Sequence, residues 1–190
     1  AAGALGSMQK DAARDILLRA LQPGRAITDH KVRNAAVAAL GRYRSPQVAE
    51  TLLRFAREDA TYTVEATATG ALANQLYTPE ILDVLRQNAE KPSHGEVIRE
   101  AAVRTLAHFE EIAGIEAAQR LAAYGQPDRS RPVGIDALAR LARRLDREKP
   151  EERARRKEIR DYLVSLLSDP HERSINAAIH ALATLGDAEA

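Results

Sequence analysis

The sequence predicts an all-α fold in which about five helix pairs stack into an α-solenoid. Three observations lead to this prediction: an alanine-rich phrase recurs, each copy has apolar residues at helical spacing, and turn signals separate the copies. The phrase is VRNAAVAALGRY at residues 32–43, and variants of it stand at residues 64–75, 98–109, 130–141 and 174–185. A pair of short helices cannot bury its apolar stripe alone, whereas stacked pairs cover one another. We therefore expect a single repeat domain over residues 1–190.

A leucine anchors each copy, and successive anchors lie 35, 32, 34, 32 and 44 residues apart. Most copies have an alanine four residues before the anchor and a larger apolar side chain three residues after it. Gly134 and Gln75 are the exceptions in these two columns. Small side chains let helices approach closely, so the alanine column supports stacking. The anchors are Leu5, Leu40, Leu72, Leu106, Leu138 and Leu182.

Each copy predicts the second helix of a pair, and the segment before it predicts the first helix. In residues 32–43 the apolar positions recur at the spacing of one helical face. That face consists of Val32, Ala35, Ala36, Ala39, Leu40 and Tyr43. The first helices are indicated by Ile16, Leu17, Ala20, Leu21, Val48, Leu52, Ala56, Ile159, Tyr162, Leu163, Leu166 and Leu167.

Capping residues mark where several helices should begin. A hydroxyl or carboxylate directly before a proline suits a helix start, because proline is tolerated at the first helical position. These pairs are Ser45-Pro46, Thr78-Pro79 and Asp169-Pro170. Ser93 with Glu96 is a candidate capping box. Threonine-rich residues 61–69 would suit a strand by propensity, but their anchor keeps step with the other copies, so we expect a helix.

The composition of the chain excludes several kinds of site and several classes of protein. The chain has no cysteine, which excludes disulfides and thiolate metal sites. No apolar run approaches the roughly 20 residues that span a bilayer, and no secretory signal is visible, so we expect no membrane partner. A cytoplasmic location is favoured, although an extracellular one stays open. The first copy begins in mid-helix at Ala1, and the chain ends where another first helix is due. We therefore expect a piece of a longer protein.

The longest interval between anchors contains a charged insertion, DREKPEERARRK, near residues 146–157. Residues 128–160 carry 12 Lys and Arg against 7 Asp and Glu. We interpret the insertion as a solvated extension of the last first helix, with a contact surface as the alternative. Nucleic acid is not an expected partner, because acidic residues interleave with the basic ones and only five Tyr and two Phe offer stacking surfaces.

No constellation of catalytic residues stands out in the sequence. No two histidines have the i, i+4 spacing of a helical zinc site. The chain lacks the Gly-x-Ser-x-Gly turn of a serine nucleophile, a Walker-type phosphate loop and the Gly-x-Gly-x-x-Gly dinucleotide motif. We therefore expect no catalytic, cofactor-binding or metal-ligating residue and no cofactor. The five histidines are His30, His94, His108, His171 and His180.

One charged row recurs with the repeat. Arg33, Glu65, Arg99 and Arg131 each follow the first position of their copy, and Ile175 breaks the row in the last copy. In stacked helical repeats, such residues often bridge to oppositely charged residues of a neighbouring copy. We take this row as candidate contacts between repeats, with a ligand-facing row on the concave side as the alternative.

The phrase VRNAAVAALG resembles HEAT repeats in their short-period form, which also occurs in bilin-lyase-like proteins, and the likeness covers essentially the whole chain. Three stretches are similar to the HEAT-like C-terminal region of bacterial aminopeptidase N-type zinc peptidases. The Tyr124-Gly125-Gln126-Pro127 turn followed by Arg129-Ser130-Arg131 is the most specific element, and Asp59-x-x-Tyr62-x-Val64-Glu65-Ala66 supports it. The three stretches are residues 29–43, 91–109 and 122–141.

The resemblance implies a role rather than a reaction. In that family the His-Glu-x-x-His motif lies in an upstream catalytic domain, so no catalytic residue carries over to this chain. The C-terminal helical domain packs on the catalytic domain and restricts peptide access. Pro132 and Gly134 depart from the alanine-rich phrase and are candidate hinge residues. The alternatives are a free-standing module that binds a protein or peptide, and a nucleic-acid-binding or bilin-lyase-like repeat protein.

Overall fold

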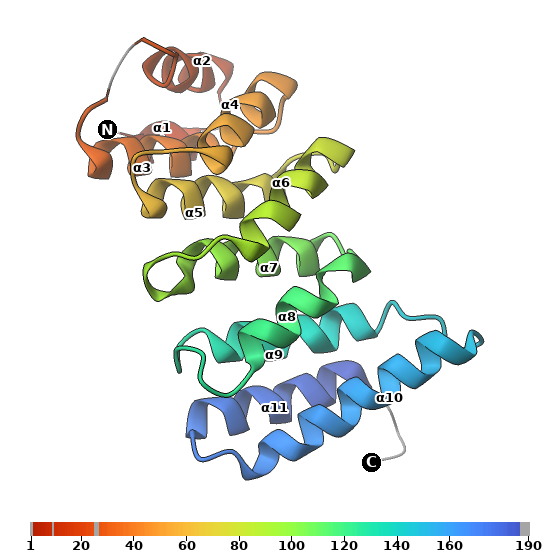
Figure 1. Ribbon diagram of the computed structural model, residues 1–190. Helices are drawn as coiled ribbons and strands as arrows, with labels where there is room; N and C mark the ends of the chain where they lie inside the picture. The colour runs from red at the N-terminus through yellow and green to blue at the C-terminus, as the bar shows by residue number, and fades with distance from the viewer. Residues whose placement is uncertain (1, 9, 25–26, 187–190) are drawn as a thin grey trace. The chain divides into compact units, whose positions relative to one another are not determined.

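The computed structural model describes residues 2–8, 10–24 and 27–186, and within these ranges the fold is all helical (Figure 1). The prediction of an all-α solenoid of stacked helix pairs is confirmed. Short 3-10 turns follow or precede several α-helices. The α-helices are α1 (Ala2–Met8), α2 (Asp11–Ala20), α3 (His30–Leu40), α4 (Pro46–Arg57), α5 (Tyr62–Ala71), α6 (Pro79–Glu90), α7 (Val97–His108), α8 (Ile115–Ala122), α9 (Arg131–Ala142), α10 (Pro150–Ser165) and α11 (Glu172–Leu185).

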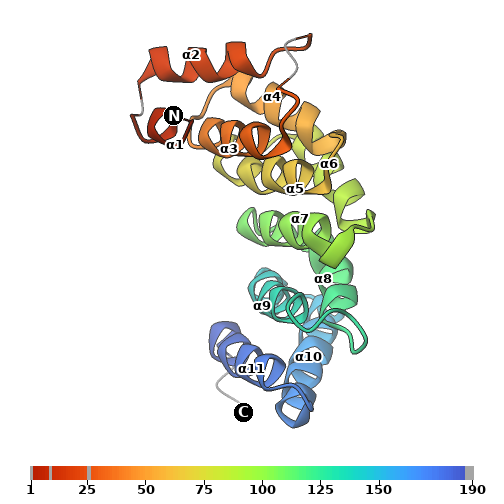
Figure 2. The same ribbon diagram turned by 90° about the vertical axis from the view of Figure 1, so that its left-hand side faces the viewer.

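The chain forms two compact units, Ala1–Thr105 and Leu106–Ala190, whose boundary falls inside α7. In the first unit, α3 packs against α1, α2 and α5, and α4 packs against α2, α5 and α6. The recurring phrase therefore forms one layer of helices and the segments between copies form the other, as Figure 2 shows for α3 and α5 beside α4 and α6.

The second unit repeats this arrangement. Here α9 packs against α8, α10 and α11, and α11 also packs against α10. The charged insertion supplies the beginning of α10, a helix of 16 residues against 12 in α4 and α6. The predicted extension of the last first helix thus begins at Pro150. The preceding residues 146–149 lie outside the helix, where Glu152 accepts a hydrogen bond from Asp146 N.

The anchor and alanine columns form the core. The four central anchors are buried, whereas Leu5 and Leu182 are partly exposed. Gly134 replaces alanine at a close approach of α9 to α8: a Cβ there would lie 2.5 Å from Ala122 N and 2.6 Å from Ala118 O. The glycine is therefore explained by packing. The buried central anchors are Leu40, Leu72, Leu106 and Leu138.

Buried polar side chains also join neighbouring copies. Gln75, the exception in its column, donates to Tyr43 O at 2.8 Å from a buried position. Asn88 donates to Ala56 O and to Thr69 Oγ1 at 2.9 and 2.7 Å. Thr69 lies in α5, so the threonine-rich segment is a helix, as its alignment predicted. The Thr69 hydroxyl accepts the hydrogen bond from Asn88 and so helps to join neighbouring copies.

Two details of the sequence prediction are wrong. The predicted face of α3 included Val32 and Ala35, yet both are exposed and Val37 is buried instead. The helix after Asp169-Pro170 begins at Glu172, because the Asp169 carboxylate is held by another helix. A helical stripe shows that one face is apolar, but it does not show which edge a neighbouring helix covers.

Two of the predicted helix caps are present, and the predicted capping box is not. Ser45 and Thr78 accept hydrogen bonds from Val48 N and Ile81 N, as predicted. Ser93 does not form the capping box. Its hydroxyl accepts from Ile98 N, beyond a 3-10 turn that contains Gly95 at a φ of 62°. In the described part of the chain, no helix is both long enough and apolar enough to cross a membrane.

Candidate functional site

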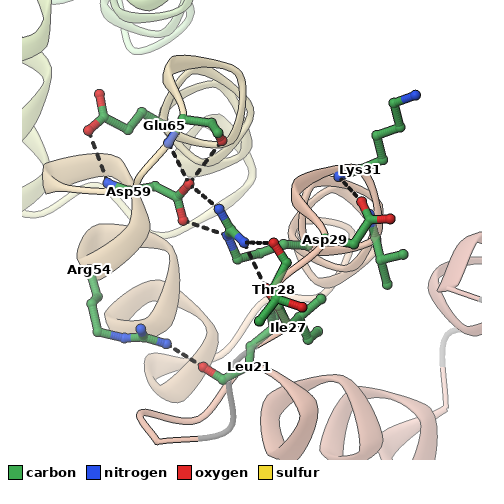
Figure 3. Close-up of polar contacts among 11 residues, drawn as sticks. Leu21, Ile27, Thr28, Asp29, Lys31, Arg54, Asp59 and Glu65 are labelled. Carbon is green, nitrogen blue, oxygen red and sulfur yellow. Dashed lines mark hydrogen bonds and ion pairs between the residues drawn. The ribbon is translucent and has the colours of Figure 1, made fainter.

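The first charged contact between copies joins α3 to the segment after α4. Arg33 donates to both carboxylate oxygens of Asp59, with Nε–Oδ2 at 2.7 Å and Nη2–Oδ1 at 2.8 Å (Figure 3). Arg33 Nη1 also donates to Ile27 O at 2.7 Å. Thr61 donates to Asp59 from both its backbone nitrogen and its hydroxyl. Every oxygen of this mostly buried carboxylate is therefore paired, as a buried charge requires.

Electrostatics favour the charged form of this pair. Burial raises the pKa of Asp59, but the hydrogen bonds from Arg33 and Thr61 together outweigh it and hold the pKa below its ordinary value. The hydrogen bond with Asp59 in turn raises the pKa of the Arg33 guanidinium. Both groups are charged at neutral pH, so the contact is an ion pair.

The second contact has the opposite polarity. Glu65 on α5 is buried and lies 2.8 Å from the ammonium of Lys91, which follows α6. Glu65 Oε1 also accepts a hydrogen bond from Asp59 N at 3.0 Å (Figure 3). Arg33, Asp59, Glu65 and Lys91 thus form one continuous polar chain through the first unit.

The third contact lies in the second unit and repeats the first. Arg131 on α9 is 1% exposed and donates to both oxygens of Asp169, at 3.0 and 2.5 Å. Its Nε donates to Ala122 O, the last carbonyl of α8. His171 donates to Asp169 Oδ1 from its backbone nitrogen. The hydrogen bonds from Arg131 hold the pKa of Asp169 well below its usual range.

The remaining row member, Arg99, is paired locally. It donates to Glu96 at 2.7 Å and to Glu90 O at 3.0 Å, both within nine residues of it in the chain. The row therefore holds three long-range ion pairs and one short-range pair. We name the long-range pairs the repeat clamps: Arg33–Asp59, Glu65–Lys91 and Arg131–Asp169. Glu65 and Arg131 are buried, so neither side chain is available to a ligand on the concave side.

The two candidate hinge residues lie in the first turn of α9. Pro132 stands at the start of the helix, where its missing N–H has no intrahelical acceptor to lose. Gly134 packs on the backbone of α8. A hinge at this point stays a prediction.

A hollow of about 810 Å³ lies between α2 and α4 in the first unit. Leu18, Leu21, Glu50, Arg54 and Arg57 contribute to its walls. Arg54 donates to Leu21 O and lies over the Phe55 ring, and burial lowers the pKa of its guanidinium. Charges of both signs line this hollow.

The second unit contains an arginine-rich surface that the sequence predicted only as part of a basic segment. Arg140, Arg143, Arg144 and Arg147 lie at or just after the end of α9, and all four are exposed. They line two hollows of about 570 and 420 Å³, which share Arg143 and Thr184 in their walls. The signal available in the sequence was the i, i+3, i+4, i+7 spacing of these arginines.

In the part of the chain that the structure describes, no group of three His, Asp or Glu side chains is placed to hold a metal ion. Asp169 and His171 form a pair at 3.2 Å between Oδ1 and Nδ1, but that carboxylate is already held by Arg131. The arrangement at Asp169 stabilises a turn.

Comparison with known proteins agrees with the repeat architecture. Residues 1–73 match the family of HEAT repeats. A designed armadillo repeat protein, YIII(Dq)4CqI, has a similar structure with a TM-score of 0.58 and 17% identity over 97% of this chain and 91% of that one. At this identity the likeness shows the fold alone.

A second solved structure, human deoxyhypusine hydroxylase in complex with glycerol, overlaps more loosely. Its TM-score is 0.44 at 18% identity, covering 97% of this chain and 77% of that one. No curated protein matches the chain. The stacked helix pairs and the armadillo-like structure show the fold of a helical-repeat protein, and residues 1–73 match HEAT repeats.

Proposed function

We propose that this helical-repeat scaffold is non-catalytic and works by binding protein, and that its partner is the catalytic domain of a zinc aminopeptidase in the same polypeptide. The scaffold would pack on that domain and restrict the access of peptides. The aminopeptidase part of the proposal rests on the sequence resemblance.

One observation carries the proposal. Asp59, Glu65 and Arg131, which belong to the stretches that resemble the peptidase region, are members of the repeat clamps. These residues fix the spacing of neighbouring helices, so the resembling motifs preserve the placement of helices rather than a reaction. Fixed placement is what a wall beside a catalytic chamber requires.

The test begins with the coding sequence upstream of Ala1. We expect a His-Glu-x-x-His motif with a further Glu, which are the zinc ligands and general base of such peptidases. The upstream domain and residues 1–190 would then be expressed separately and mixed. Co-elution in gel filtration is expected, and the upstream domain alone is expected to cleave long peptides faster than the complete enzyme.

Two results would overturn the peptidase proposal: an upstream region that holds only further repeats, or separate domains that never associate. The first result would favour the free-standing interaction module. The arginine-lined hollows of the second unit support that second candidate, because they offer a charged surface that the repeat clamps do not use.

A further inference from the structure

The arginine-rich surface of the second unit lies where two helices end. The larger hollow is lined by Arg143, Arg147 and Arg156 together with residues 183–186 at the end of α11. The smaller one adds Arg140 and Arg144 beside the end of α7. We name the joined hollows the arginine groove. The two hollows share Arg143 and Thr184, and five arginines line them in all.

Arg156 lines the larger hollow from a buried position. It donates to Ala142 O at 2.6 Å and to Leu185 O at 2.8 Å, which are the last helical residues of α9 and α11. Carbonyls at a helix C-terminus carry partial negative charge that would repel an anion. Because Arg156 pairs with these carbonyls, the repulsion is reduced where the exposed arginines project.

Two of the exposed arginines form ion pairs that are themselves exposed. Arg140 pairs with Asp136 at 2.9 Å and Arg144 with Glu110 at 3.3 Å, and all four side chains are about half exposed. Exposed ion pairs contribute little free energy, so an incoming carboxylate can replace them at small cost. Several arginines facing one hollow suit bidentate recognition of carboxylates.

We propose that the arginine groove binds an acidic segment of a partner protein, through carboxylates that pair with Arg140, Arg143, Arg144 and Arg147. This deepens the proposed protein-binding function and rests on it. The segment would supply two or more closely spaced Asp or Glu side chains.

The charge pattern favours an acidic protein segment over nucleic acid. Residues 106–190 contain 14 Lys and Arg against 15 Asp and Glu, so the unit offers no extended positive field to follow a phosphate backbone. The lining residues of the two hollows include one ring, that of His108, and no Phe, Tyr or Trp on which successive bases could stack. A short acidic segment needs only the local cluster.

The test uses residues 1–190 and a fluorescein-labelled hexaglutamate peptide, with binding followed by fluorescence polarisation. The groove variant R143Q/R144Q is expected to weaken binding by about tenfold at low salt, since two charge-assisted contacts are lost. The matched control R153Q/R173Q removes the same charge from exposed arginines elsewhere in the unit and is expected to weaken binding by less than about threefold. Circular dichroism checks that both variants stay folded.

Equal losses in the two variants would overturn the proposal, because they would show dependence on net charge alone. Tighter binding of a 20-nucleotide single-stranded RNA than of hexaglutamate would overturn it in favour of nucleic acid. If hexaglutamate does not bind while the upstream domain still co-elutes with residues 1–190, only the acidic-segment proposal fails. If the upstream domain also fails to bind, the protein-binding function fails with it.

Discussion

The ammonium of Lys91 lies 2.8 Å from the buried carboxylate of Glu65, so this repeat clamp has its anion on the helix and its cation on the segment after the next helix. Arg33 and Asp59 occupy the corresponding places with the charges exchanged. These two clamps therefore use opposite charges at the two places, and either sign serves at either place.

Glu65 has two separable roles, and two substitutions distinguish them. Glu65→Gln keeps an oxygen for Asp59 N and loses only the pair with Lys91, which is 39% exposed, so a cost below about 1 kcal/mol is expected. Glu65→Leu leaves Asp59 N without its acceptor and is expected to cost about 1–3 kcal/mol more. Urea unfolding followed by circular dichroism measures both. Equal effects would contradict a role for the Asp59 hydrogen bond.

Arg131→Met should be among the most damaging single changes, because it leaves the buried carboxylate of Asp169 without its cation. A loss of about 3–5 kcal/mol in the free energy of unfolding is expected. The matched control is Arg57→Gln, which breaks an exposed pair with Glu80 and should cost less than about 1 kcal/mol. Similar losses in the two variants would show that burial does not govern the strength of these pairs.

The repeat clamps should make the protein sensitive to acid. Asp59 and Asp169 have folded-state pKa values below the ordinary 3.8, so they add stability that is complete above about pH 5 and is lost as pH falls. Asp169→Asn should therefore flatten the decline of the unfolding free energy between about pH 5 and pH 3, measured by urea titration at each pH. Asp83→Asn, which removes an exposed carboxylate outside the repeat clamps, should leave the slope nearly unchanged. An unaltered slope in D169N would contradict the prediction.

Gly134→Ala should destabilise the second unit by about 1–3 kcal/mol, because the added methyl would overlap the backbone of α8. Gly70→Ala is the control. Gly70 lies inside α5 with no atom within 4 Å of the added Cβ, and the change should stabilise by about 0.5–1 kcal/mol. Thermal melts of the two variants should shift in opposite directions. A neutral G134A would show that α8 and α9 are not held at this distance.

The hinge at Pro132 and Gly134 predicts a local opening at the start of α9. Bending there would break the hydrogen bonds that Val133 N and Gly134 N donate to Ser130 O at 3.0 and 3.4 Å. Native-state hydrogen exchange should then be at least about tenfold faster at these two amides than at Leu138 and Leu141. Uniformly slow exchange along α9 would rule the hinge out.

The repeat could be predicted from the sequence because its signals are local. The spacing of Leu40 from Tyr43 and the proline after Ser45 each act within one helix or turn. The partners of the charged row could not be predicted in this way, because they lie one copy further along the chain. Arg33 and Glu65 meet an opposite charge 26 residues later, whereas the equivalent place for Arg99 is Gly125.

The insertion also made the Arg131–Asp169 clamp hard to predict from the sequence. It lengthens the anchor interval from 32 to 44 residues and the clamp spacing from 26 to 38, so Arg131 reaches Asp169. The same carboxylate had been predicted to cap α11, and an arginine on another helix competes for it. Local capping preferences do not include such a competitor. The arginine groove was hidden for a similar reason, because Thr184 and Arg143 are brought together only by the packing of α11 on α9.

The exchanged charges of Glu65 and Lys91 have a consequence for how the chain finds its fold. Neighbouring copies with nearly the same phrase can be mistaken for one another while the chain collapses. If α3 took the place of α5, Arg33 would meet Lys91, and two like charges would be brought together as the site lost water. The exchanged signs of the first two clamps therefore disfavour a stack in which α3 takes the place of α5.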